Sequence, residues 1–145
     1  MKENSKILLA EKGITDWNIV VCREASDAEK YAAEELQYFL KEISGATFPI
    51  LDDNNEETAH EILVGNSRRI NKLNLDNQTD KLGADGFVVC TEKGKLVITG
   101  GRPRGTLYGV YAFLEEHLGC RWFTPKVSSI PKRSVIEIPA IHDAQ

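Results

Sequence analysis

GGRPRGTLYGVYAFLEEHLGCRWF, residues Gly100–Phe123, is the stretch that decides the fold. It joins a glycine-rich turn, a helical segment, a glycine that can end a helix and an aromatic exit before Pro125. Apolar residues in the middle of the stretch recur at the helical period of about 3.6 residues, which predicts one face packed on a core. That face comprises Leu107, Val110, Tyr111, Leu114 and Leu118.

The other side of this helix carries the small residues Gly105, Gly109 and Ala112, at spacings of four and three. Small side chains let a second surface approach the helix backbone, although each interior glycine costs roughly 1 kcal/mol relative to alanine. The pattern therefore predicts a helix that packs on two sides. The alternative is a frayed start, with Gly105 and Gly109 outside the helix or near its N-cap.

A second helix is predicted upstream. Ser26 stands three residues before Glu29, which is the spacing of a capping box, and Gly45 supplies a helix stop. Between them, apolar residues again recur at helical spacing, and the acidic side chains fall largely on the other side. We assign to the core face Tyr31, Ala32, Leu36, Phe39, Leu40 and Ile43.

Short apolar runs predict the strands. A Glu92-Lys93-Gly94 turn suits a β-hairpin with glycine at positive φ, and Pro49 places its own run near a sheet edge. Ser67–Leu75 is either a short helix or an irregular connection. With two main helices, the order of elements predicts an α+β fold built on a mixed sheet of about five strands. The runs are Lys6–Ala10, Asn18–Cys22, Phe48–Leu51, Glu61–Val64, Gly86–Thr91, Lys95–Thr99 and Ser134–Ile138.

Length and composition restrict the class of protein. A chain of 145 residues suits one domain, 1–145, and hydrophobic and charged fractions of 41% and 28% are those of globular proteins. No apolar run is long enough to span a membrane, so we expect no membrane segment. The compartment stays open, because a chain trimmed of a leader would read the same way.

The net charge of −4 conceals an asymmetry between two parts of the chain. Residues 1–94 carry 11 basic and 18 acidic side chains, whereas residues 95–133 carry 7 and 2. The basic surplus thus surrounds the helix of the deciding stretch. It is too scattered for a nucleic-acid surface, which needs a dense basic stripe with stacking aromatics, so we expect no nucleic-acid partner.

No catalytic or metal chemistry emerges from the residues. The three cysteines, Cys22, Cys90 and Cys120, lack metal-ligand spacing, and their odd number leaves at least one thiol unpaired in a monomer. The histidines are isolated from one another, and no G-x-S-x-G elbow is present. We expect no metal, no cofactor and no free-standing enzyme. The turn at Gly100–Gly105 is read as structural, because Pro103 removes a donor that an anion site would use.

Several of these segments together resemble a known family. ILVG at Ile62–Gly65, DGFVV at Asp85–Val89 and the run Leu96–Phe123 resemble the N-terminal domain that precedes the catalytic barrel in α-glucuronidase-like glycoside hydrolases. That domain is similar in fold to the second domain of family 20 β-hexosaminidases, a fold called zincin-like although this sequence has no zinc motif. The likeness covers roughly residues 18–140.

The resemblance implies a non-catalytic accessory domain. In such enzymes the catalytic carboxylates belong to the barrel that follows, so no catalytic residue is carried over, and a barrel of at least about 200 residues is expected after residue 145. The partner would be this downstream catalytic domain. The resemblance also suggests a secreted or periplasmic setting for polysaccharide degradation.

A rival reading is a carbohydrate-binding module for acidic sugars. Aromatic rings would offer faces to a sugar, and an arginine would pair with a uronate carboxylate. Both readings place the functional surface around the same helix and its exit, where arginines and aromatic side chains lie together. The candidate interface or ligand residues are Arg102, Arg104, Tyr108, Gly109, Arg121, Trp122 and Phe123.

Overall fold

The computed structural model describes residues 6–65, 86–101, 104–124 and 127–144. Its largest element is a six-stranded mixed sheet with the strand order β10-β5-β6-β4-β2-β3. The four strands β6, β4, β2 and β3 are parallel, whereas β5 and β10 run antiparallel to their neighbours. The bounds are β2 Asn18–Val21, β3 Ile50–Asp52, β4 Glu61–Val64, β5 Phe87–Glu92, β6 Lys95–Gly100 and β10 His142–Ala144.

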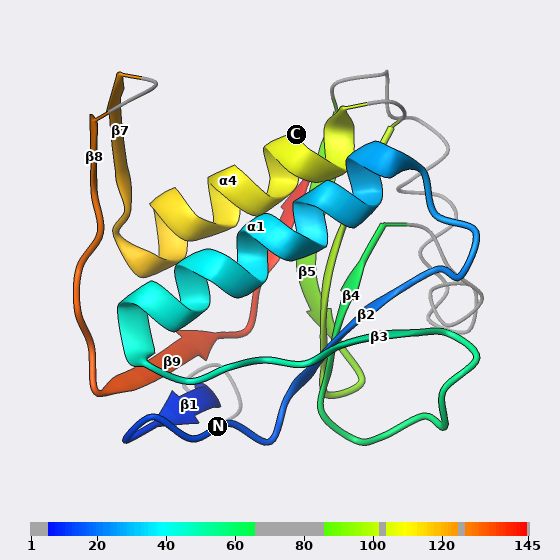
Figure 1. Ribbon diagram of the computed structural model, residues 1–145, viewed down its shortest axis with the longest axis horizontal. Coiled ribbons are helices and arrows are strands. Elements are labelled where there is room, and N and C mark those ends of the chain that lie inside the picture. Colours follow the sequence, from blue (N-terminus) through cyan, green and yellow to red (C-terminus); the bar gives the residue numbers. More distant parts are fainter. Residues whose placement is uncertain (1–5, 66–85, 102–103, 125–126, 145) are drawn as a thin grey trace.

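Two long helices, α1 (Asp27–Ser44) and α4 (Gly105–Leu118), lie side by side on one face of this sheet (Figure 1). The predicted α+β arrangement, with two helices packed on a mixed sheet, is therefore confirmed. α1 begins with the predicted capping box, in which the Ser26 side chain accepts from the Glu29 backbone and the Glu29 side chain accepts from the Ser26 backbone. It ends at Gly45, which adopts the left-handed conformation at φ 81°.

The small face of α4 packs on the domain's own sheet. A Cβ atom added at Gly109 would lie 3.0 Å from Ile98 Cγ2 and 3.2 Å from Phe87 Cβ. One added at Gly105 would collide with the Gly86 carbonyl oxygen and with Gly100. The frayed-start alternative holds only for Gly105, the first residue of the helix, since Gly109 lies within it.

The apolar stripe of α4 faces α1 and the core. Val110, Leu114 and Leu118 are fully buried, while Leu107 and Tyr111 are half-buried against the core. On α1 the assigned core face is confirmed for Ala32, Leu36, Phe39, Leu40 and Ile43 but is wrong for Tyr31, whose side chain is 48% exposed. Tyr31 lies at the border of the stripe and turns outward.

Strands β5 and β6 form the predicted hairpin. Glu92 pairs with Lys95, so the turn consists of Lys93 and Gly94, which adopt φ values of 51° and 82°. Positive φ at both central residues is the type I′ geometry that matches the twist of paired strands. The turn returns the chain along β6 directly to Gly100, beside the start of α4.

Both faces of the main sheet are buried. Alternate residues of its central strands join the core beneath the helices, among them Ile19, Ile62 and Ile98. The residues between them form a second buried cluster on the opposite face. Double-sided burial explains why these strands read as continuous apolar runs in the sequence. The second cluster comprises Val20, Leu63, Val88, Cys90 and Val97.

Two smaller sheets complete the described fold. β1 (Lys6–Glu11) pairs antiparallel with β9 (Val135–Pro139), and β7 (Arg121–Thr124) pairs with β8 (Val127–Ser129). The β1–β9 ribbon buries Leu9 and Ile136 in the core beneath the helices. The predicted strand at Phe48–Leu51 is shifted to β3, an edge strand as Pro49 implied. The predicted segment Ser67–Leu75 lies outside the described residues.

Candidate functional site

The outer surface of the helix pair carries three large exposed side chains. Tyr31 and Tyr38 of α1 are 48% and 53% exposed, and Tyr108 of α4 is 39% exposed. Tyr31 and Tyr38 are seven residues apart and so lie on one face of α1, outside its buried stripe. On α4, Tyr108 is exposed, whereas Gly105 and Gly109 are buried against the sheet. We call these three residues the tyrosine surface.

A hydrogen bond closes the seam between the two helices. The Tyr111 hydroxyl donates to Glu35 Oε1 at 2.7 Å, which ties the middle of α4 to the middle of α1. Burial raises the pKa of the Tyr111 phenol, and the hydrogen bond and negative charge of Glu35 raise that pKa further, with a smaller contribution from Tyr31. The phenol therefore stays protonated and remains a donor throughout the physiological pH range.

The structure puts the predicted candidate residues in different parts of the domain. Arg104 is exposed at the N-cap of α4, one turn before Tyr108. Arg121 is exposed on β7, where Nη1 donates to the Cys120 carbonyl oxygen at 3.1 Å. Gly109 is buried against β5 and β6, so the domain's own sheet occupies its small face. These contacts leave Arg104 and Tyr108 together on the outer surface.

For three other candidates the structure describes no side chain. Arg102 lies outside the described residues. Trp122 and Phe123 belong to β7, whose backbone is described, but their side chains are not. Of the three aromatic candidates, Tyr108 is the one whose side chain is described, and it is exposed. Sequence reasoning missed Tyr38 and misassigned Tyr31, although their spacing of seven was a signal for a shared face of α1.

The last described strand, β10, pairs with the part of β5 that contacts α4. Ala144 of β10 pairs with Val88, the neighbour of Phe87, and Phe87 contacts the first half of α4 at Gly109. Ile141 fixes the start of β10, because it exchanges two hydrogen bonds with Thr91: its N–H donates to Thr91 Oγ1 and its carbonyl accepts from the Thr91 N–H.

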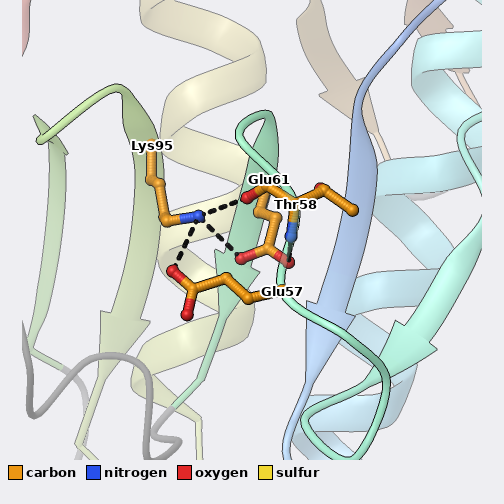
Figure 2. A network of polar contacts seen from close by, with 4 residues as sticks. All are labelled: Glu57, Thr58, Glu61 and Lys95. Atoms are coloured by element: carbon orange, nitrogen blue, oxygen red, sulfur yellow. Dashed lines mark hydrogen bonds and ion pairs between the residues drawn. The ribbon is translucent and has the colours of Figure 1, made fainter.

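A buried ion pair lies at the opposite end of β6. The Lys95 ammonium donates to Glu61 Oε1 at 2.9 Å and to the Thr58 carbonyl oxygen at 2.7 Å, and it pairs with Glu57 Oε2 at 3.2 Å (Figure 2). Glu61 Oε2 also accepts from the Thr58 N–H at 3.1 Å. The side chains of Lys95 and Glu61 are 8% and 1% exposed. This network fastens the loop before β4 to the start of β6.

The described ranges hold no cluster of three or more metal-ligating side chains. All three cysteines are free thiols, with Cys22 half-buried and Cys90 and Cys120 buried. Burial, together with the charge of Glu92, raises the pKa of the Cys90 thiol to about 11, so it is a protonated core residue at neutral pH. Among the described helices, none has the length and apolar character needed to cross a membrane.

Comparisons with known proteins agree with this architecture. The sequence profile described as "Glycosyl hydrolase family 67 N-terminus" matches residues 10–113. The structure of a family GH115 4-O-methyl-α-glucuronidase with specificity for decorated arabinogalactans matches with a TM-score of 0.63 at 20% identity. That match covers 96% of this chain but only 18% of the glucuronidase. At this identity the likeness establishes a shared fold.

A Streptomyces plicatus N-acetyl-β-hexosaminidase, solved with Thio-NAglucal, matches with a TM-score of 0.49 at 10% identity. The match covers 96% of this chain and 23% of the hexosaminidase. No curated protein sequence matches significantly.

Proposed function

Since the chain belongs to the glycosyl hydrolase family 67 N-terminus family, we propose that it is a non-catalytic accessory domain of a glycoside hydrolase. Its role is to pack against and support a downstream catalytic (β/α)8 barrel. The single observation that carries the proposal is the tyrosine surface, three exposed aromatic side chains on the two paired helices.

The chemistry of this surface suits a protein partner. Tyrosine is enriched at interfaces because it combines a large apolar area with a hydroxyl that can bond a neighbour. Three such side chains, at 39–53% exposure, lie on the two paired helices and offer aromatic area to a partner. The Tyr111–Glu35 bond ties α1 to α4, so the two helices would present their exposed tyrosines to a partner in a fixed relative position.

The position of β10 supports the choice of partner. β10 is hydrogen-bonded along β5, and the contacts between Ile141 and Thr91 are buried or nearly so. A domain that continued from Gln145 would therefore emerge from an edge strand held against β5, the strand on which α4 packs. A connection that passes the β10 edge of the sheet would bring it to the tyrosine surface, and the loop-closure cost grows only slowly with the length of that connection.

Hydrogen exchange tests the proposal on the natural gene product. The chain should be expressed both as residues 1–145 and with the sequence that follows it, and amide exchange of α1 and α4 compared. We expect added protection around Tyr31, Tyr38 and Tyr108 in the longer chain. A gene that ends at Gln145, or a downstream domain that leaves these amides unchanged, would overturn the proposal.

A second candidate function is recognition of acidic sugars at the start of α4. The observation that favours it is the pairing of Arg104 and Tyr108, both exposed and one helical turn apart. An exposed guanidinium can bond a uronate carboxylate in a bidentate manner beside an aromatic face. Titration of residues 1–145 with hexagalacturonate separates the two functions: heat that disappears in Arg104→Ala supports the second, and no heat argues against it.

A further inference from the structure

A groove lies at the end of the domain that contains the β5–β6 turn. It has a volume of about 1120 Å³ and is bounded by β1, the segment from β1 to β2, the loop 57–60 and the turn 93–95. Because β6 runs from Lys95 at this groove to Gly100 at the start of α4, the groove and the start of α4 occupy opposite ends of the sheet. It is thus distinct from the Arg104–Tyr108 pair.

The groove contains an aromatic platform. The His60 ring is stacked on Trp17, with ring centroids 5.1 Å apart and planes inclined by 27°. Trp17 is 3% exposed and its Nε1 donates to the Leu8 carbonyl oxygen at 2.8 Å, so the indole is fixed. His60 is exposed. The indole packs on one face of the imidazole, and because His60 is exposed its ring is accessible to a ligand.

The Lys95 network holds this platform in place. Lys95 anchors Thr58 and Glu57, and the His60 carbonyl oxygen accepts from the Asn18 N–H at 3.1 Å at the start of β2. Figure 2 shows the Lys95 ammonium enclosed by the acceptors of this loop. A buried ion pair contributes little net stability because desolvation offsets its attraction. Its clear structural effect here is to fix the loop that carries His60.

The charges around the groove balance. Lys95 is neutralised by Glu61. The remaining charged side chains at the rim are three lysines and three carboxylates, which give no net charge and argue against a polyanion such as nucleic acid. They supply donors and acceptors together, which is what hydroxyl groups require because a hydroxyl both donates and accepts. The six are Lys6, Lys12, Lys93, Glu11, Asp16 and Glu57.

An extended peptide is a poorer fit than a hydroxyl-rich chain. Strand addition to β1 would need its free carbonyl groups. Two consecutive ones are already occupied, because the Leu8 carbonyl accepts from Trp17 Nε1 and the Leu9 carbonyl accepts from Thr15 Oγ1 at 2.6 Å. The segment from β1 to β2 therefore blocks backbone pairing along this wall of the groove.

We infer that this groove binds a neutral oligosaccharide. One sugar ring lies on the uncovered face of His60, the apolar side chains of Leu8 and Ile14 flank it, and its hydroxyls bond the rim carboxylates and ammonium groups. Leu8 and Ile14 are 45% and 69% exposed at the groove, which suits the apolar face of a sugar ring. The inference is independent of docking at the tyrosine surface.

Calorimetric titration of residues 1–145 with xylohexaose and cellohexaose tests the inference, with hexagalacturonate as the acidic comparison. We expect at least one neutral hexaose to bind and His60→Ala to weaken it about tenfold or more, equivalent to about 1.4 kcal/mol. His60→Phe keeps a ring at the platform and should retain binding. Tyr38→Ala, on the tyrosine surface, should leave the affinity unchanged.

A second groove variant tests whether a loss of binding in His60→Ala comes from a local change in structure rather than from the groove itself. Ile14→Asp adds a charge at a 69% exposed position and should weaken binding without lowering the melting temperature. The inference is overturned if neither neutral hexaose binds, if only hexagalacturonate binds, or if His60→Ala and Ile14→Asp bind as tightly as the parent chain.

Discussion

The hydroxyl of Tyr111 and the carboxylate of Glu35 meet at 2.7 Å across the seam between α1 and α4, although the two residues are 76 positions apart in the chain. This bond lies at the edge of the core and beneath the tyrosine surface. It therefore contributes both to the stability of the helix pair and to the geometry of the surface proposed to meet a partner.

Tyr111→Phe removes this bond and leaves the ring in place. We expect a loss of about 1 kcal/mol in the free energy of unfolding, because an intramolecular hydrogen bond contributes roughly 0.5–1.5 kcal/mol net. Urea denaturation measures the change. A double-mutant cycle with Glu35→Ala is the control, and an interaction energy near zero would show that the bond contributes nothing.

Gly109→Leu should destabilise residues 1–145 by themselves. The added side chain meets Ile98 and Phe87, where even a Cβ atom has only 3.0 to 3.2 Å of space. Overpacking typically costs about 1–3 kcal/mol and occasionally more. Ala112→Leu, on the same helix but at a half-buried position, is the matched control. Equal melting temperatures for the Gly109 variant and the parent would contradict the packing described here.

Lys95→Met should be among the most damaging single changes. It leaves Glu61 buried, at 1% exposure, without its cation, and breaking a buried pair costs about 3–5 kcal/mol. Adding Glu61→Leu removes the uncompensated charge and should recover much of the loss. Urea denaturation of the single and double variants measures the two changes in stability. A double variant less stable than Lys95→Met would show that the unpaired charge of Glu61 is not the cause of the loss.

Thr106→Val should be neutral or stabilising. Thr106 is 2% exposed, and within the described part of the chain its Oγ1 is the buried side-chain polar atom without a hydrogen-bond partner. Valine has nearly the same shape and carries no group that needs a partner, so the desolvation cost of the hydroxyl is removed. Thermal unfolding by circular dichroism measures the effect, and a clear fall in melting temperature would indicate that the hydroxyl does have a partner.

Stability should fall as the pH rises from about 9 toward 11. The Cys90 pKa is raised from 9.0 to about 11 in the folded chain, so over this range the folded state binds more protons than the unfolded state. Stability then decreases with pH by linkage, and the contribution is fully present only below the unfolded pKa. Cys90→Val should flatten this part of the profile of unfolding free energy against pH. Identical slopes for the two chains would contradict the assignment.

Local signals predicted much of the helical layer and the centre of the sheet. β4 has the predicted bounds, Glu61–Val64, and α1 starts and ends at its predicted cap and stop. These elements are specified by residues close together in sequence. β10 was not predicted, because its three residues His142–Ala144 have little strand character and are held by pairing with β5.

The residues of the sites could not be grouped from the sequence, because only tertiary packing brings them together. Lys95 and Glu61 begin their strands 34 residues apart, and only the neighbouring positions of β4 and β6 bring them together. The platform of Trp17 and His60 likewise joins two segments by tertiary packing. Tyr31 was misassigned because a helical period cannot decide the side for a residue at the border of a stripe.

The pairing of β1 with β9 has a consequence for how the chain folds. The strand near the start of the described chain finds its partner near the end, with Ile7 opposite Ile138 and Glu11 opposite Val135. During synthesis, Leu9 can complete its surroundings only after β9 has left the ribosome, so the part of the core beneath the β1–β9 ribbon closes late. Contacts of such long sequence separation slow folding and leave apolar surface exposed in the meantime.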